Sequence, residues 1–284
     1  MAEECPGINS KMMGKAKACE GCPNQKICSS SKPDPDIDHI KERLRKIKYI
    51  LPVMCGKGGV GKSFLTVLLA KYFSKNFKTI VLDMDLSGPT ISNLTVDQKT
   101  IIDIDEHFDP IATNGFDVVS VGDFKGFDDA IFTSQTKNYL LKKVFINCRG
   151  LEEYDVMVID TPPNVTDEHL ALFSYFKNLN AVLISTADFL SVADLQRQTT
   201  FCGKAKINIL GVVENMKSFR CHKCDKINTF NDEKHIFNFC IERNIKYIGS
   251  LNYDKEVARN LDSGVVILKY SMEEVCRYIF NSLK

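Results

Sequence analysis

The sequence predicts an α/β protein with a doubly wound, mostly parallel sheet and a cysteine-rich N-terminal extension. From residue 49 onward, short apolar runs alternate with stretches of helical periodicity, the pattern of strands joined by crossover helices. A glycine-rich loop follows the first of these runs. Residues 1–33 have little apolar content, whereas 44% of the 284 residues are hydrophobic, enough for a sizeable core. We therefore expect an extension over 1–33 and one folded domain over 34–284.

The elements follow in order along the chain. Residues 35–48 place isoleucine and leucine at helical spacing, with acidic residues early and basic ones late, which predicts an amphipathic helix with a solvated basic face. Residues 95–150 show no clear pattern and are expected to hold an irregular insertion. The other apolar runs predict strands over 49–55, 79–85, 154–160, 180–186 and 207–215, and helices over 63–73, 167–176 and 190–201.

The charge balance and hydropathy exclude several classes of protein. There are 37 basic against 36 acidic residues, so no overall field would attract nucleic acid or an acidic membrane. No apolar run is long enough to span a bilayer, and the N-terminus lacks the layout of a signal peptide. The apolar face of the tail, 272–284, predicts a helix docked on the core, because its polar face is too acidic for anionic lipid. We expect a cytoplasmic protein with no membrane or nucleic-acid partner.

The loop "GKGGVGKS" fits the pattern G-x-x-x-x-G-K-[ST] between a strand and a helix, the context that gives this motif its meaning. Its glycines let backbone N–H groups surround a phosphate, and the following helix adds its positive end. Lys62 should reach the β- and γ-phosphates of ATP, and the Ser63 hydroxyl should coordinate Mg²⁺. The predicted ATP-binding residues of the loop are Gly56, Lys57, Gly58, Gly59, Val60, Gly61, Lys62 and Ser63.

Lys57, directly after the first glycine, lies at the wrong end of the loop to duplicate Lys62. It is either a solvated surface lysine or a group that reaches the nucleotide of a partner subunit, as an arginine finger does. The loop resembles the deviant Walker A signature of the ParA/MinD/nitrogenase-reductase class of P-loop ATPases. That resemblance implies that Lys57 acts in trans.

Three aspartates follow predicted strands where this resemblance places functional carboxylates. It implies that Asp85 activates the attacking water, that Asp83 supports the metal shell, and that Asp160 holds Mg²⁺ through water. An aspartate at a strand end can also cap a helix or form a turn, and for any one of the three taken alone this structural role is the alternative. Asn215, in "GVVENM", resembles the asparagine that contacts adenine, and its amide suits a purine edge. The predicted catalytic residues are Lys57, Lys62 and Asp85.

Cys221 and Cys224 form a C-x-x-C pair far along the chain from the loop. Two such thiols can bind one metal, but a closed tetrahedral site needs four ligands. His222 and His235 could complete a zinc knuckle within the chain. Alternatively, two copies of the pair could meet on a dimer axis and hold one 4Fe–4S cluster.

The extension carries four more cysteines, Cys5, Cys19, Cys22 and Cys28, spaced as C-x13-C-x2-C-x5-C. Four thiolates on a polar segment suit a 4Fe–4S cluster, which would order the segment as it binds. The spacing alone suits Zn²⁺ equally well. The five other cysteines stand singly among apolar or helical residues and are expected to be packing residues, namely Cys55, Cys148, Cys202, Cys240 and Cys276.

With the deviant lysine loop and the C-x-x-C pair, the leader resembles the cysteine-extended branch of the Mrp/ApbC-like family, the scaffold ATPases of cytosolic iron–sulfur assembly. The resemblance implies a stable N-terminal cluster and a labile one bridging subunits. It also implies a homodimer, or a heterotetramer with a smaller paralogue that lacks the extension. Apo iron–sulfur proteins and downstream assembly factors would be its other partners. A ParA/MinD-like positioning ATPase and a zinc-stabilised nucleotide-binding regulator are the alternatives.

The sequence departs from this family at three places. Asn164 stands where a glycine usually follows T-P-P, and asparagine tolerates positive φ better than most residues. "IFTSQTK" (131–137) replaces an expected Trp-Arg-Gly-Pro-like segment, and "HK" replaces a proline-containing pair between the two cysteines. These departures predict a divergent member with weak ATP hydrolysis.

Overall fold

The computed structural model describes residues 12, 15–20, 25, 29, 35–95, 100–127, 133–176, 179–231 and 234–284. Within them an eight-stranded sheet has the order β10-β7-β6-β1-β5-β2-β4-β3, and all neighbours are parallel except β3 and β4. The strands are β1 (Tyr49–Met54), β2 (Thr79–Asp83), β3 (Ile111–Ala112), β4 (Asp117–Ser120), β5 (Val156–Asp160), β6 (Asn180–Ser185), β7 (Asn208–Glu214) and β10 (Tyr247–Ser250).

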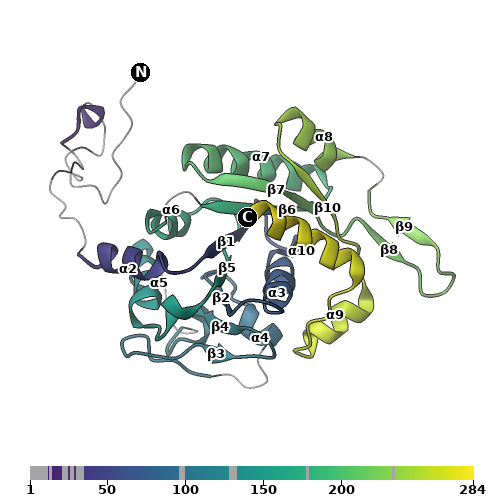
Figure 1. The fold of residues 1–284 in the computed structure, drawn as a ribbon. Helices are drawn as coiled ribbons and strands as arrows, with labels where there is room; N and C mark the ends of the chain where they lie inside the picture. Colours follow the sequence, from purple (N-terminus) through teal and green to yellow (C-terminus); the bar gives the residue numbers. More distant parts are fainter. Residues whose placement is uncertain are drawn as a thin grey trace.

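Helices cover both faces of this sheet, which confirms the doubly wound fold (Figure 1). One face packs against α3 (Lys62–Phe73), α9 (Lys255–Asp262) and α10 (Tyr270–Leu283). The other packs against α2 (Asp36–Leu44), α5 (Ser134–Asn147), α6 (Asp167–Ser174), α7 (Phe189–Lys204) and α8 (His235–Glu242). Shorter elements are η1 (Lys17–Cys19), α4 (Ile91–Thr95), η2 (Val121–Asp123) and η3 (Leu151–Glu153).

The central strands have apolar residues on both sides because both faces are covered. In β5, Val156 and Val158 belong to the core under α3, and Met157 and Ile159 belong to the core under α5. All four side chains are fully buried. This is why the strand is a continuous apolar run and does not alternate with polar residues.

Two chain segments depart from the sequence-based expectation. The structure resolves the unassigned middle into β3, β4 and α5, although residues 96–99 and 128–132 lie outside the described part. A hairpin of β8 (Ser218–Arg220) and β9 (Ile227–Thr229) forms a separate two-stranded sheet that projects from the body (Figure 1). The hairpin was not among the predicted elements, because its strands are only three residues long.

The docked C-terminal helix and the packing cysteines are confirmed. Helix α10 buries Met272, Val275, Cys276 and Ile279 against the sheet. The five single cysteines are at most 1% exposed, and burial raises the pKa of the thiols of Cys55, Cys148, Cys202, Cys240 and Cys276. Across the described residues, no helix has the length and apolar character needed to cross a bilayer.

Helix α2 is shorter than predicted because the chain turns after Arg45 to enter β1. Arg43 fixes its end to the neighbouring layer. The guanidinium donates to the carbonyls of Phe145, Ile146 and Cys148 at 2.6 to 2.9 Å, and to the Glu152 carboxylate at 2.6 and 2.9 Å. The Arg43 guanidinium therefore donates hydrogen bonds to carbonyl groups at the end of α5, where the helix itself supplies no donors.

Arg43→Ala is expected to lower the free energy of unfolding by about 2–4 kcal/mol, because it strips charged hydrogen bonds from carbonyls in a partly buried site. Arg45→Ala is the matched control, since Arg45 is an exposed arginine at the same helix end, and it should change stability by less than about 0.5 kcal/mol. Urea unfolding of the two variants measures the difference. Equal stability of the two would contradict this role for Arg43.

Candidate functional site

The glycine-rich loop connects β1 to α3 at the centre of the sheet, between β5 and β6. Gly61 begins α3 with φ of 90°, a backbone conformation that favours glycine. A Cβ on Gly61 would lie 2.1 Å from the side-chain nitrogen of Asn215, and one on Gly56 would lie 2.4 Å from the backbone of Asp194. The loop is therefore clamped between the end of β7 and helix α7, and neither contact tolerates a larger residue.

Lys62 and Ser63 both point to the Asp160 carboxylate at the end of β5. The Lys62 ammonium lies 2.6 Å from Asp160 Oδ2, and the Ser63 hydroxyl donates to the same oxygen at 2.7 Å. Thr66, one turn further along α3, donates to Asp160 Oδ1 at 2.8 Å. The structure thus brings together three residues that the sequence predicted and adds Thr66, which can be found only by noting that it shares a helix face with Lys62 and Ser63.

Lys62 is only 6% exposed, and Asp85 Oδ2 lies 3.4 Å from its ammonium nitrogen. Burial alone would lower the pKa of Lys62, but the carboxylates of Asp160 and Asp85 outweigh burial and raise that pKa. Lys62 is therefore a buried, positively charged group that can bind a phosphate oxygen in place of the Asp160 carboxylate.

Asp83 is fully buried and accepts hydrogen bonds from protein groups on both carboxylate oxygens. Oδ2 accepts from the backbone N–H groups of Thr90 and Ile91 at 2.9 Å and from the Ser120 hydroxyl at 3.1 Å, and Oδ1 accepts from the Asp85 N–H at 3.3 Å. Burial and the nearby Asp160 raise the pKa of Asp83 to about 7. These contacts fasten the segment after β2 to the sheet, so Asp83 sets the position of Asp85. Its support of a metal shell stays a prediction.

A cavity of about 320 Å³ lies over the loop and is lined by Gly58, Gly59, Lys62, Ser63 and Asp85. Asp85 is 8% exposed there, and its Oδ1 accepts from the Ser87 N–H and hydroxyl at 3.1 and 2.6 Å. The second oxygen of Asp85 is the one that faces Lys62. Asp85 therefore lies in the cavity beside Lys62, where its carboxylate could orient a water molecule next to a bound phosphate.

A second, mostly apolar pocket of about 180 Å³ adjoins the first and shares Gly61, Phe64 and Met216 with it. Asn215 lies at its wall and donates to the Val60 carbonyl at 2.9 Å. Tyr253, on the loop before α9, lines the opposite part. An apolar slot with an amide at its wall suits a purine base. The sequence predicted Asn215 but not Tyr253, because the segments that carry these two residues are far apart in the chain. Phe64 directly follows the predicted loop, but an apolar residue at the start of a helix gives no sign that it lines a base pocket.

Lys57 differs from Lys62 in burial and in pairing. Its side chain is 42% exposed, and its one carboxylate contact in the described part of the chain is Asp188 Oδ1 at 3.5 Å. The hydroxyls of Thr186 and Ser191 and the backbone N–H of Ser191, together with Lys57, hold the pKa of Asp188 well below its usual range. Lys57 therefore stands at the rim of the loop, in a position that solvent or another molecule can reach.

Asn164, the departure from the family pattern after the T-P-P segment, has φ of 64°. Its N–H donates to the Cys55 carbonyl at 3.1 Å. Asparagine is one of the few residues other than glycine that adopt this conformation readily. The expected turn is therefore preserved, although the glycine is absent.

Cys221 and Cys224 lie at the turn of the β8–β9 hairpin, away from the glycine-rich loop (Figure 1). Cys221 is partly exposed and Cys224 is exposed. The backbone N–H groups of Lys223 and Cys224, and the Cys224 thiol, bond to the Cys221 sulfur and lower the pKa of Cys221. Asp225 closes the turn with φ of 57°. The turn therefore stabilises a thiolate before any metal is bound.

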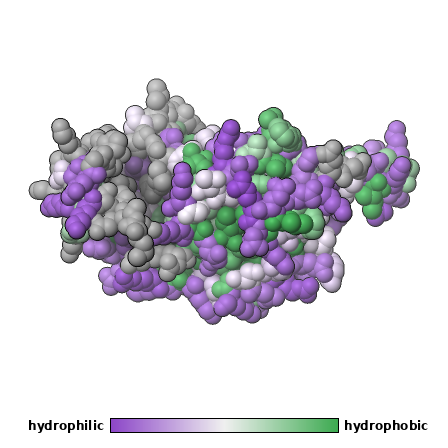
Figure 2. Space-filling view, turned by 90° about the horizontal axis from the view of Figure 1, so that it is seen from above, coloured by the Kyte–Doolittle hydropathy of each residue, from purple (hydrophilic) through white to green (hydrophobic). Residues whose placement is uncertain are grey.

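The described part of the chain brings together no group of three or more His, Cys, Asp or Glu side chains suited to a metal. His222 and His235 therefore do not complete a zinc knuckle with the cysteine pair in this structure. Figure 2 shows the hairpin projecting from the body with hydrophobic residues on it, and Ile227 and Phe230 are each 60% exposed. The two thiols of this exposed hairpin would supply two of the four ligands that a closed tetrahedral metal site needs.

Iodoacetamide is expected to react with Cys221 of the reduced, metal-free protein at lower pH than with the same residue of the unfolded chain. The reason is the lowered pKa, which increases the thiolate fraction in the folded hairpin. Mass spectrometry of the alkylated peptide, with and without urea, gives the two pH profiles. Coincident profiles would show that the turn does not stabilise the thiolate.

Of the four leader cysteines, Cys19 ends η1 and is 6% exposed. Cys5, Cys22 and Cys28 lie outside the described residues. The leader site therefore stays a prediction from the sequence.

The parallel sheet, the glycine-rich loop and the lysine–aspartate contact at its centre define a P-loop NTPase. Residues 46–284 match the family model described as ParA, NUBPL iron-transfer P-loop NTPase. The chain belongs to the NUBPL iron-transfer P-loop NTPase family, which confirms the family predicted from the sequence motifs.

Relatives and solved structures agree with this assignment. The chain is 34% identical over 303 residues to a cytosolic Fe-S cluster assembly factor Nubp1 homolog of Drosophila ananassae, covering 99% of this chain and 98% of that protein. The corresponding protein of Drosophila melanogaster is 33% identical over 305 residues, covering 99% and 97%. Both alignments therefore include the cysteine-rich leader.

Among solved structures, a nucleotide-binding protein from Archaeoglobus fulgidus in complex with ADP aligns with a TM-score of 0.68 and 30% identity, over 80% of this chain and 91% of that one. The septum site-determining protein MinD of Pyrococcus horikoshii, complexed with Mg-ADP, aligns with a TM-score of 0.60 and 15% identity, over 80% and 94%. At that identity the MinD likeness concerns the fold alone.

Proposed function

We propose that this protein is an ATP-dependent scaffold that assembles 4Fe–4S clusters in the cytosol and transfers them to apoproteins. The observation that carries the proposal is the presence, in one chain of this family, of a formed nucleotide cleft and an exposed, thiolate-stabilising cysteine pair. The full-length likeness to proteins named cytosolic Fe-S cluster assembly factors supports it.

The loop residues are suited to bind ATP and Mg²⁺. The Ser63 hydroxyl and the Asp160 carboxylate, 2.7 Å apart, are the hard oxygen ligands that Mg²⁺ prefers. Mg²⁺, when bound, would neutralise charge on the phosphates. Lys62 exchanges Asp160 for a phosphate oxygen, Asp85 orients the attacking water, and Asn215 contacts the base at the wall of the apolar pocket. Asp83 holds the Asp85 segment in place, in support of the Mg²⁺ shell.

The cluster is cargo held between two subunits. Cys221 and Cys224 of one subunit and the same pair of another supply four thiolates, the number that a 4Fe–4S cluster needs. The second subunit is either another copy of this chain or a smaller paralogue without the leader, in a heterotetramer. Cys5, Cys19, Cys22 and Cys28 hold a second, stable cluster in each leader.

ATP binding and cluster release are coupled through the subunit contact. Lys57 stands at the rim of the loop and is 42% exposed, so it can reach the phosphates of a partner subunit. ATP then favours the closed arrangement of the two subunits. Hydrolysis, which we infer to be slow, opens this arrangement and exposes the cluster to an acceptor protein.

The test is a measurement of iron, sulfide and zinc per chain after anaerobic reconstitution, followed by transfer to an apo iron–sulfur protein with and without ATP. Iron and sulfide in equal amounts, and transfer that depends on ATP, are the expected results. Zinc on the cysteines would identify a zinc-stabilised nucleotide-binding regulator. A colourless protein that hydrolyses ATP would identify a positioning ATPase of the ParA/MinD type.

A further inference from the structure

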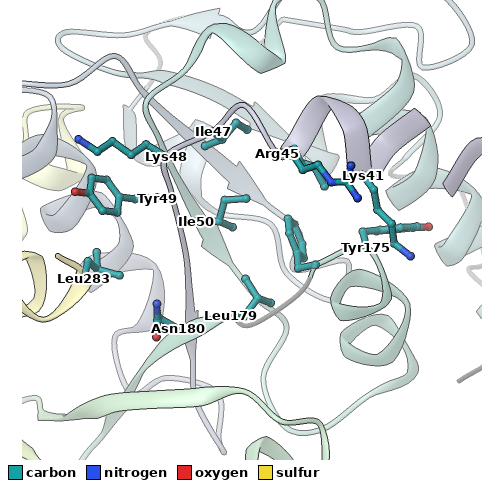
Figure 3. A pocket seen from close by; sticks show the side chains of 12 residues that line it. Lys41, Arg45, Ile47, Lys48, Tyr49, Ile50, Tyr175, Leu179, Asn180 and Leu283 are labelled. Carbon is teal, nitrogen blue, oxygen red and sulfur yellow. The ribbon is translucent and has the colours of Figure 1, made fainter. Parts of the chain in front are cut away.

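A pocket of about 310 Å³ opens at the edge of the sheet opposite the glycine-rich loop. It lies between the end of α2, the first residues of β1 and β6, and the ends of α6 and α10 (Figure 3). Strand β1, six residues long, separates it from the loop by roughly 20 Å. Among the residues that the structure describes, none lines both this basal pocket and the nucleotide cleft.

The interior of the basal pocket is apolar and aromatic. Tyr175 and Leu179 form its deep wall and are 7% and 6% exposed, and Ile50 and Phe176 lie beside them. In Figure 3 the Ile50 and Leu179 side chains point into the same hollow. Such a surface favours a flat ring or a branched hydrocarbon group over a purely polar ligand.

The rim is basic. Lys41 and Arg45, one turn apart on α2 and its end, lie on the Tyr175 side of the hollow, and Lys48 lies on the other side, 5.2 Å from the centre of the Tyr49 ring (Figure 3). None of the twelve lining residues is aspartate or glutamate. The rim is therefore locally positive in a chain whose 37 basic and 36 acidic residues nearly balance.

These cations differ from their neighbours in the acidic partners that the described residues offer them. In the part of the chain that the structure describes, no ion pair involves Lys41, Arg45 or Lys48, whereas nearby Arg43 pairs with Glu152 and Lys142 pairs with Asp36. The end of a helix favours a cation, which accounts for Arg45. It does not account for Lys48, which lies beyond the helix, or for the apolar hollow between them.

We propose that the basal pocket binds a small organic anion, with its ring or branched chain in the hollow and its carboxylate against Arg45 and Lys41. The volume lies at the lower end of ligand pockets, about 300–1,000 Å³, and suits a single ring with a short acidic arm. Guanidinium and ammonium groups bind a carboxylate through charge-assisted hydrogen bonds. The lining residues of this pocket belong neither to the nucleotide cleft nor to the β8–β9 hairpin.

The probe is 4-fluorophenylacetate, observed by fluorine NMR with the full chain and saturating ADP, and 4-fluorophenylacetamide is its uncharged counterpart. The acid should bind and the amide should bind at least about tenfold more weakly, a loss typical of a charge-assisted contact. The double variant Lys41→Gln/Arg45→Gln should show the same loss for the acid, and Lys46→Gln, an exposed basic residue outside the pocket, should bind like the wild type.

Three outcomes would overturn the proposal. One is equal binding of acid and amide. Another is wild-type affinity in the double variant, whose thermal melting should match that of the wild type because neither side chain forms an ion pair with a described residue. The last is displacement of the probe on raising ADP from zero to saturation, which would place it at the glycine-rich loop.

Discussion

Lys62→Ala is expected to abolish nucleotide binding and, with it, ATP hydrolysis. The ammonium is the buried cation that faces both Asp160, at 2.6 Å, and Asp85, at 3.4 Å, in the phosphate cavity. Removing one fixed donor of this kind lowers the rate of the chemical step by about 10²–10³-fold. Without the lysine, the phosphates would also meet the carboxylates of Asp160 and Asp85 without the ammonium that lies between them, so binding fails before the chemical step.

The same substitution should also destabilise the protein itself. Among the described residues, it leaves the fully buried Asp160 carboxylate with the Ser63 and Thr66 hydroxyls as its remaining partners. Breaking a buried ion pair by removing one partner costs about 3–5 kcal/mol. The variant should therefore unfold at lower urea concentration, and a stability equal to the wild type would contradict the buried contact.

Lys57→Ala is the matched control in the same loop. Its ion pair with Asp188 is long, at 3.5 Å, and both side chains are more than 40% exposed, so stability should change by less than about 1 kcal/mol. Nucleotide binding should be retained, while hydrolysis and ATP-dependent cluster transfer should be lost, because in the proposed mechanism this lysine acts on the partner subunit. Wild-type hydrolysis by Lys57→Ala at concentrations that favour the dimer would reject the role in trans.

The nucleotide site shows what a sequence can predict. The phosphate loop is a contiguous run whose chemistry depends on spacing, so Gly56 to Ser63 and their order between strand and helix were predictable. Asp160 was predictable because it ends a strand, and the carboxyl ends of parallel strands meet at one edge. Its contact with Lys62 confirms that placement.

Other features depend on segments that only the fold brings together. Asp83 fastens the segment after β2 through donors from Thr90, Ile91 and Ser120, and no local pattern links these residues. The apolar base pocket joins the start of α3 to the loop before α9. The β8–β9 hairpin, whose turn holds the cysteine pair, could not be predicted, because its strands are too short to show a periodic pattern.

Replacing Cys221 and Cys224 together with serine is expected to remove the bridging cluster and leave the leader clusters. If each leader holds one 4Fe–4S cluster and each dimer shares one more, iron should fall from about six to about four atoms per chain. Subunit association should weaken in parallel, because the shared cluster joins the two hairpins. Iron and sulfide analysis together with analytical ultracentrifugation, on anaerobic samples, measures both effects.

Two controls separate this loss from damage to the protein. His222→Ala changes an exposed residue between the two cysteines and should keep all the iron, since the described residues place this histidine in no metal-binding group. Replacing Cys5, Cys19, Cys22 and Cys28 with serine should remove the other four irons and leave association intact. ATP binding should survive in the two hairpin variants, because no described residue belongs to both the hairpin turn and the nucleotide cavity. If the variant without Cys221 and Cys224 keeps its iron and still dimerises, the cysteine pair does not bind the transferred cluster. Any cluster would then be bound by the leader cysteines alone.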